Sequence, residues 1–110
     1  MKDYYSLFVK LSLQQCTNDD YKDKLKVKRH NDASKKLRKL QEEMKQNNCI
    51  EVLSKLLYYD DYRVKVNAAS LCLDMNVFVN KAINTLKTIV DKCDDSTICF
   101  SAKVLLQSVL

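Results

Sequence analysis

Apolar residues recur along most of this chain at intervals of three and four, the spacing that places side chains on one face of an α-helix. The segment 3–16, for example, carries on one face Tyr4, Leu7, Phe8 and Leu11. The same reasoning predicts helices over residues 3–16, 32–46, 49–58, 62–75, 79–92 and 97–110. A weaker pattern over 20–29 predicts one more helix, which either ends near His30 or continues into the next.

The helix over 62–75 differs from the others because it is apolar on nearly all sides. A helix of that kind is expected to pack against several neighbours at once. Small residues recur on its inner face and on that of the last helix, and we expect Ala68 and Ala102 at close helix–helix contacts.

Two helix pairs in the second half of the chain repeat each other. Apolar positions of the segment 50–57 recur 33 residues later, and a second set recurs 34 residues later: Asp61, Val64, Ala68 and Leu71 as Asp95, Ile98, Ala102 and Leu105. Two unrelated amphipathic hairpins can align in this way by chance, but eight matched positions favour a repeat. Units 49–75 and 79–110 are therefore expected to stack, each covering the apolar face of the other.

Glycine and proline are both absent from the 110 residues. Tight β-hairpins usually need glycine, so this composition argues against a strand-rich fold. Helix ends must then be capped by the plentiful Asn and Asp residues. We expect a single all-α domain over residues 1–110.

The segment 61–71 resembles the second-helix signature of HEAT repeats, in which Asp is followed by Val-Arg, Ala-Ala and Leu; here it reads DYRVKVNAASL. Lys65 stands where that family usually has Arg, and Cys99 stands there in the second copy, which weakens the Asp–Arg ladder common between HEAT units. Residues 31–110 are also similar to a small bacterial HEAT-like family of unknown function. The resemblance implies a HEAT-like α-helical repeat, that is, a short α-solenoid of stacked antiparallel helix pairs.

The five cysteines form no C-x-x-C pair, and their number is odd. A secreted disulfide framework would show an even number in a loop-rich chain. We expect reduced thiols in a cytoplasmic protein, most of them in the core, at Cys16, Cys49, Cys72, Cys93 and Cys99. The first residues lack the pattern of a signal peptide, and no apolar run is long enough to cross a membrane.

Catalytic chemistry finds little support in the sequence. The only histidine, His30, lies among charged residues and is expected to be solvated. Cys99 falls in the first turn of the last helix, which can stabilise a thiolate, but the repeat places it beside a core position. A phosphate-binding loop is excluded because it requires glycine. We expect no enzyme activity, no metal and no cofactor.

Three features indicate surfaces for a partner. Residues 22–39 hold nine Lys and Arg against two Asp, and this segment is either an electrostatic footprint for an acidic partner or a solvated helix face. Three tyrosines fall within five residues, at Tyr58, Tyr59 and Tyr62. A polar stripe on the helix over 62–75 falls where stacked repeats bind their partners. The predicted binding residues are Lys35, Lys36, Arg38, Lys39, Tyr58, Tyr59, Tyr62, Arg63, Asn67, Ser70 and Asp74.

These features favour a protein-binding module. Small helical proteins of this composition often act as immunity proteins beside bacterial toxins, including those of contact-dependent growth inhibition. By that analogy the chain neutralises a cognate toxin that has an acidic surface. Two other classes remain as alternatives: a nucleic-acid-binding HEAT-like protein and a structural subunit of a larger assembly.

Overall fold

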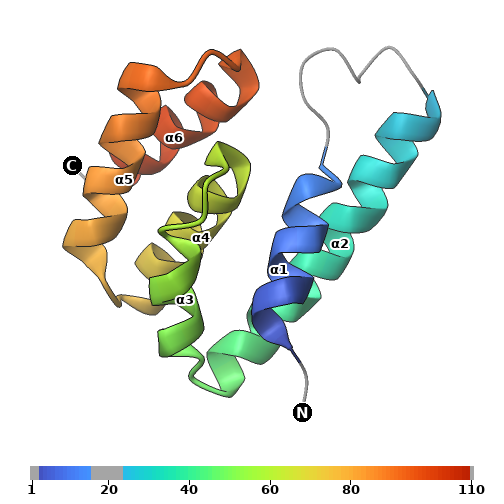
Figure 1. Cartoon of the computed structure of the whole chain (residues 1–110), viewed down its shortest axis with the longest axis horizontal. Helices are drawn as coiled ribbons and strands as arrows, with labels where there is room; N and C mark the ends of the chain where they lie inside the picture. The colour runs from blue at the N-terminus through green and yellow to red at the C-terminus, as the bar shows by residue number, and fades with distance from the viewer. Residues whose placement is uncertain (1–2, 16–23, 110) are drawn as a thin grey trace.

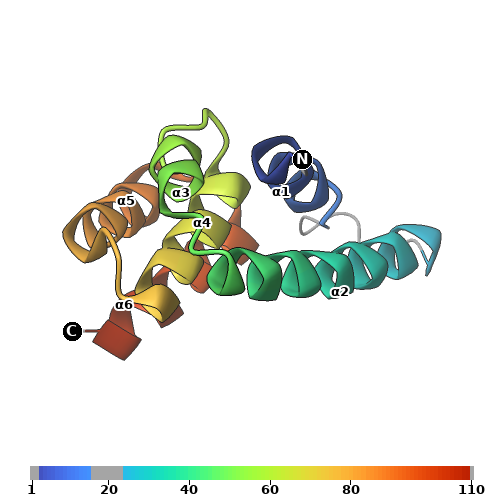
Figure 2. The ribbon, with the colours of Figure 1, turned by 90° about the horizontal axis from the view of Figure 1, so that it is seen from below.

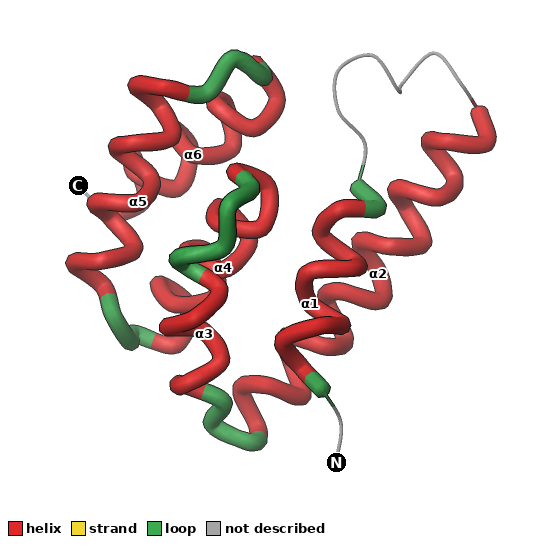
Figure 3. Tube along the Cα trace, viewed as in Figure 1, coloured by secondary structure: helices red, strands yellow, loops and turns green. Residues whose placement is uncertain are grey.

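The computed structural model describes residues 3–15 and 24–109, and these residues form helices joined by short loops, with no strand among them (Figures 1 and 3). The helices are α1 (Tyr4–Leu13), α2 (Lys24–Gln46), α3 (Ile50–Leu56), α4 (Tyr62–Met75), α5 (Val79–Lys92) and α6 (Ser96–Val109). The expected all-helical fold is therefore confirmed for the described residues. The radius of gyration is 13.4 Å, as expected for a compact domain of about 100 residues.

The helices form three consecutive antiparallel pairs in two layers. Viewed along the layers, α1, α3 and α5 lie on one side and α2, α4 and α6 on the other (Figure 2). Helix α4 lies at the centre and contacts α1, α3, α5 and α6. This position explains why α4 is apolar nearly all round, and it confirms the expectation that this helix packs against several neighbours.

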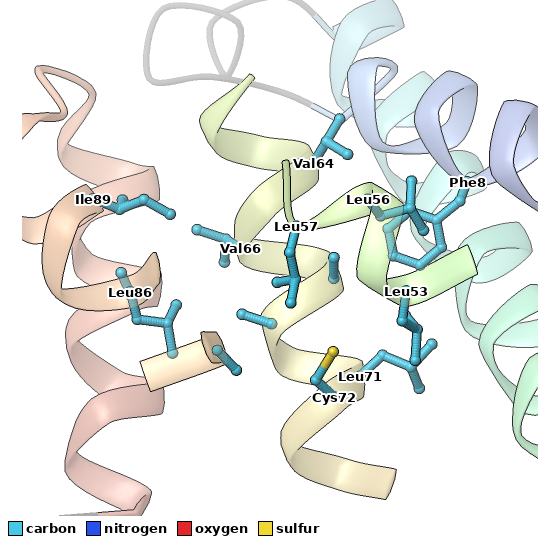
Figure 4. Close-up of a cluster of buried hydrophobic side chains, with 14 of the residues drawn as sticks. Phe8, Leu53, Leu56, Leu57, Val64, Val66, Leu71, Cys72, Leu86 and Ile89 are labelled. Atoms are coloured by element: carbon cyan, nitrogen blue, oxygen red, sulfur yellow. The ribbon is translucent and has the colours of Figure 1, made fainter. Parts of the chain in front are cut away.

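The core is continuous from α1 to α6. The Phe8 ring of α1 lies beside Leu53 and Leu56 of α3 (Figure 4), and all three side chains are completely buried. On the other side of α4, Leu86 and Ile89 of α5 complete the same cluster. Burying a side chain of this size contributes about 1.5–3 kcal/mol, so this cluster dominates the stability of the fold.

Aspartate and asparagine take over the helix-ending roles that glycine often fills. Asp61 caps α4 by accepting a hydrogen bond from the Val64 amide at 3.1 Å, and Asp95 caps α6 by accepting one from the Ile98 amide at 3.2 Å. Asn48 and Asn76 adopt left-handed backbone conformations, with φ of 53° and 57°. Asn tolerates this region better than most residues, so it can end a helix where glycine is absent.

Phe78 is the exception among the left-handed residues. Its φ is 48° just before α5, and its side chain makes no capping hydrogen bond. A non-glycine residue in this conformation costs about 1–2 kcal/mol. The Phe78 side chain is partly buried against the core, and this apolar contact favours the conformation.

Helix α2 decides between the break and the continuation that the sequence left open near His30. The helix continues through His30, Asn31 and Asp32, so Asp32 is an exposed residue within a helix and does not cap a new one. Neither proline nor glycine interrupts the segment, and Asn or Asp within a helix costs less than about 1 kcal/mol relative to Ala. Continuation, the alternative left open by the sequence, is the correct one. The predicted start of a helix at Asp20 lies outside the described residues.

Equivalent positions of the α3–α4 and α5–α6 pairs have the same local roles. Asp61 and Asp95 both cap the second helix of their pair, and Ala68 and Ala102 both have no exposed surface. Bulkier side chains at these two alanines would hold the neighbouring helices apart. The predicted burial of both alanines is confirmed.

Candidate functional site

A groove about 370 Å³ in volume runs between α1 and α2 on the surface. Helix α1 lines it with Leu7, Lys10, Leu11 and Gln14, and helix α2 with Lys36, Lys39, Leu40 and Glu43. Both sets have the spacing i, i+3, i+4, i+7, which places them on one stripe of each helix. We call this feature the α1–α2 groove. Its floor consists of the half-buried Leu7 and the largely buried Leu11 and Leu40, and lysines form its rim.

The rim of the α1–α2 groove is basic. Lys10, Lys36 and Lys39 are exposed, and none of them forms an ion pair with another described residue. Among the described residues that line the groove, Glu43 is the one carboxylate. The three ammonium groups therefore leave a positive field over the leucines.

The predicted basic residues divide between this groove and the open surface. Lys36 and Lys39 line the groove, whereas Lys35 and Arg38 are exposed but do not line it. Sequence reasoning missed Lys10, because nothing in the sequence shows that α1 lies beside this part of α2. The side chains of Lys24, Lys26, Arg29 and His30 and the whole of Lys22 lie outside the described part of the structure.

The three tyrosines divide in a similar way. Tyr58 and Tyr62 line a second groove, about 320 Å³ in volume, between the α3–α4 turn and α5. Tyr58 is 71% exposed, and the Lys81 ammonium lies 5.9 Å from its ring centre, within cation–π range. Tyr59 points instead toward α1, where its ring meets that of Tyr5 edge to face at 6.3 Å. Tyr59 therefore joins α1 to the α3–α4 turn, while Tyr58 remains open to solvent.

The polar stripe of α4 forms one wall of a third groove, about 330 Å³ in volume, whose other wall is α6. Arg63, Asn67 and Ser70 line it, and Phe100 on α6 stands beside them with 68% of its surface exposed. Asn67 also donates hydrogen bonds to Ser12 and Gln15, so it serves the packing of α4 on the N-terminal pair. The exposed Phe100 was not among the predicted residues, because the helical pattern alone does not distinguish an open apolar position from a covered one.

Asp74 lies away from that third groove. It forms an ion pair with Lys45 at the end of α2, and Lys45 also pairs with Glu42 at 3.2 Å. The two carboxylates raise the pKa of Lys45, with Asp74 the larger cause. The structure therefore places Asp74 at a contact between α2 and α4, apart from the other three residues of the predicted stripe.

The described cysteines are free thiols, and Cys72 is fully buried while Cys49, Cys93 and Cys99 are half-buried. Burial raises the pKa of Cys72 to about 11 and also raises the pKa of Cys93. The Cys99 thiol lies 3.8 Å from the Val90 carbonyl oxygen, to which it donates. Of these four cysteines only Cys72 is a full core residue, and Cys16 lies outside the described residues.

No three His, Cys, Asp or Glu side chains gather at a possible metal site within residues 3–15 and 24–109. The same part of the chain contains no helix that is both long enough and apolar enough to cross a membrane.

A family model with the description "Domain of unknown function (DUF2019)" matches residues 2–109. The chain therefore belongs to this family. No curated protein and no solved structure matches it.

Proposed function

We propose that this DUF2019 protein is a protein-binding module and that its basic face, centred on the α1–α2 groove, contacts the partner. The observation that carries the proposal is the combination of a lysine rim with a leucine floor in one groove. Charged rims steer and orient a partner, while buried apolar contacts supply most of the affinity. Such a surface suits a partner that is acidic at the edge of its interface and apolar at the centre.

The side chains that line the α1–α2 groove favour a protein over a nucleic acid as the binding partner. Binding of single strands relies on aromatic side chains that stack on bases, and no aromatic side chain among the described residues lines the α1–α2 groove. Lysine supplies all three positive charges there, whereas bidentate contacts with bases or phosphates favour arginine. A floor of leucines has no role against a phosphate backbone.

A HEAT-like arrangement of the helix pairs is part of the same proposal. The matching caps at Asp61 and Asp95, the matching buried alanines and the two layers of Figure 2 support it. Stacked helix pairs commonly present binding surfaces along one layer. In this arrangement the N-terminal pair adds its own groove beside the two repeated pairs.

The specific role that we propose is that of an immunity protein. The chain binds a toxin one to one and covers its active or partner-binding surface, with no chemistry of its own. We place this role in the cytoplasm, where a reducing environment keeps free thiols such as Cys49, Cys93 and Cys99 unpaired.

The test is co-purification with the product of the adjacent gene, followed by association kinetics across a salt series. The proposal expects a stable one-to-one complex whose association slows as salt increases, because screening weakens steering. Absence of that complex, together with salt-dependent binding to random duplex DNA, would favour the nucleic-acid alternative. An assembly with many copies of each chain would favour the structural-subunit alternative.

A further inference from the structure

We infer that the α1–α2 groove binds an acidic amphipathic helix of the partner, which lies lengthwise between α1 and α2. This inference rests on the proposed function and names the element of the partner that is recognised. A helix seated in an apolar groove is a recurrent mode of peptide recognition, with anchors at i, i+3, i+4 and i+7.

The geometry of the groove fits a helix because each wall is itself a helical stripe. From Leu7 to Gln14, and from Lys36 to Glu43, each wall extends for seven residues. At 1.5 Å per residue this length is about 10 Å, or two turns of an incoming helix. Two apolar side chains of that helix, one turn apart, can then rest on Leu7 and on the Leu11–Leu40 pair.

The order of charges along the groove also constrains the occupant. Helices α1 and α2 are antiparallel, since Tyr4 accepts a hydrogen bond from Asn47 at 2.8 Å and Gln15 donates one to Ser34 at 3.0 Å. Gln14 therefore lies near Lys36, and Leu7 lies near Glu43. The positive field extends over the Lys36 end and the middle of the groove, while Glu43 marks the other end.

Charge complementarity selects an acidic helix. Carboxylates that flank the apolar anchors can reach Lys10, Lys36 and Lys39, which lack ion-pair partners among the described residues. A basic helix would place like charges together, and like-charge contacts across an interface are strongly unfavourable. A purely apolar helix would leave the three lysines without partners.

The test uses the full chain and a fluorescent model peptide of about 16 residues, long enough for a helix to form in solution. Leucines at i, i+3, i+4 and i+7 form its apolar face, and glutamates flank that face. Two matched peptides serve as controls: one with the same composition in scrambled order, and one with lysine in place of every glutamate. Fluorescence anisotropy measures the affinity for each.

The inference expects saturable binding of the glutamate peptide and weaker binding of both controls. The double variant Lys36→Glu/Lys39→Glu should weaken binding of the glutamate peptide by at least about tenfold. The same variant should bind the lysine peptide more tightly than the original chain does. The control variant Lys87→Glu/Lys103→Glu has the same net charge at exposed positions outside the groove, so it should leave the affinity nearly unchanged.

Equal binding of the ordered and scrambled glutamate peptides would overturn the inference, because only general charge attraction would then operate. Equal losses in the two double variants would overturn it for the same reason. If the adjacent gene product still binds the Lys36→Glu/Lys39→Glu variant with full affinity, the inference fails together with the proposed contact through the α1–α2 groove, while the immunity role itself stands. If that product does not bind at all, the immunity role fails independently of the peptide result.

Discussion

Asn67 on α4 donates a hydrogen bond of 3.0 Å to the hydroxyl of Ser12 on α1, across 55 residues of sequence. Ser12 is completely buried, so its hydroxyl depends on this contact in place of water. Asn67 also donates to Gln15 at 2.9 Å, and Gln15 in turn donates to Ser34 of α2 at 3.0 Å. One side chain of the central helix is therefore connected to both helices of the N-terminal pair.

We predict that Asn67→Ala lowers the free energy of unfolding by about 1–3 kcal/mol, because it leaves the buried Ser12 hydroxyl without its partner. Urea unfolding followed by circular dichroism measures the change. The double variant with Ser12→Ala should lose less than the sum of the two single changes. The exposed Asn84 on α5 provides the matched control, and Asn84→Ala should change stability by less than about 0.5 kcal/mol. If the loss in the double variant equals the sum of the two single losses, Asn67 and Ser12 are not directly coupled.

Overpacking provides the second prediction. Ala68→Leu and Ala102→Leu should each lower the free energy of unfolding by about 1–3 kcal/mol, because both alanines have no exposed surface and belong to the common core. Lys103→Leu introduces the same side chain one residue further on, at an exposed position, and should be nearly neutral. Thermal melting of the three variants tests whether the two alanine variants melt at lower temperatures than Lys103→Leu. Equal melting temperatures for Ala102→Leu and Lys103→Leu would show that Ala102 is not at a helix contact.

The third prediction concerns alkaline pH. Burial raises the pKa of Cys72 to about 11 from the ordinary value of 9.0, so between these values the unfolded chain loses the proton while the folded chain keeps it. Stability should therefore fall as pH rises above 9.0, with the loss complete near 11. Urea unfolding at about pH 8 and about pH 10.5 measures the slope. In the variant Cys72→Ala the free energy of unfolding should depend less steeply on pH, whatever its absolute value. An unchanged dependence on pH would show that Cys72 is not the group responsible.

Reduction should leave stability unchanged. Cys49, Cys72, Cys93 and Cys99 are free thiols, so a thiol reductant has no bond to break among them. Melting temperatures with and without reductant should coincide. A clear decrease on reduction would show that a disulfide contributes to the fold and would contradict the expectation of reduced cysteines.

The binding kinetics should separate the basic face from Tyr58. Charge reversal at Lys35, Lys36, Arg38 and Lys39 should slow association with the partner more than it speeds dissociation, because exposed charges act mainly through steering. Tyr58→Ala should act mainly on dissociation if the exposed ring is an anchor of the complex. Stopped-flow measurements at low and high salt distinguish the two effects. A salt-independent loss of association in the charge variants would argue against steering.

The central and C-terminal helices could be predicted because residues next to each helix end determine where the helix begins and ends. Asp61 and Asn76 mark the two ends of α4 through cap geometry that involves only neighbouring residues, and the predicted bounds 62–75 agree with the structure. Of the two alternatives near His30, the break was wrong and the continuation was right, because Asn and Asp also occur within helices when nothing else stops the chain. Local cap signals are reliable only where the apolar pattern also changes.

The sequence alone did not show which residues of different helices line the same groove. Lys10 and Lys36 share a groove although 26 positions separate them, and Asp74 pairs with Lys45 across the molecule. Such pairs depend on which helices pack together and at what rotation. Helical periodicity gives the face of each helix but does not identify its neighbour.

The contacts of α1 have a consequence for the entropy of association. Tyr4 is joined to Asn47, Tyr5 meets Tyr59, and Ser12 is joined to Asn67, so α1 is held at its beginning, along its side and near its end. The wall that α1 contributes to the groove is therefore already ordered before any partner arrives. A groove that needs no ordering spares the partner that part of the entropic cost of binding. Removing the Asn67 hydrogen bond should accordingly weaken binding in the groove, although Asn67 itself touches no part of it.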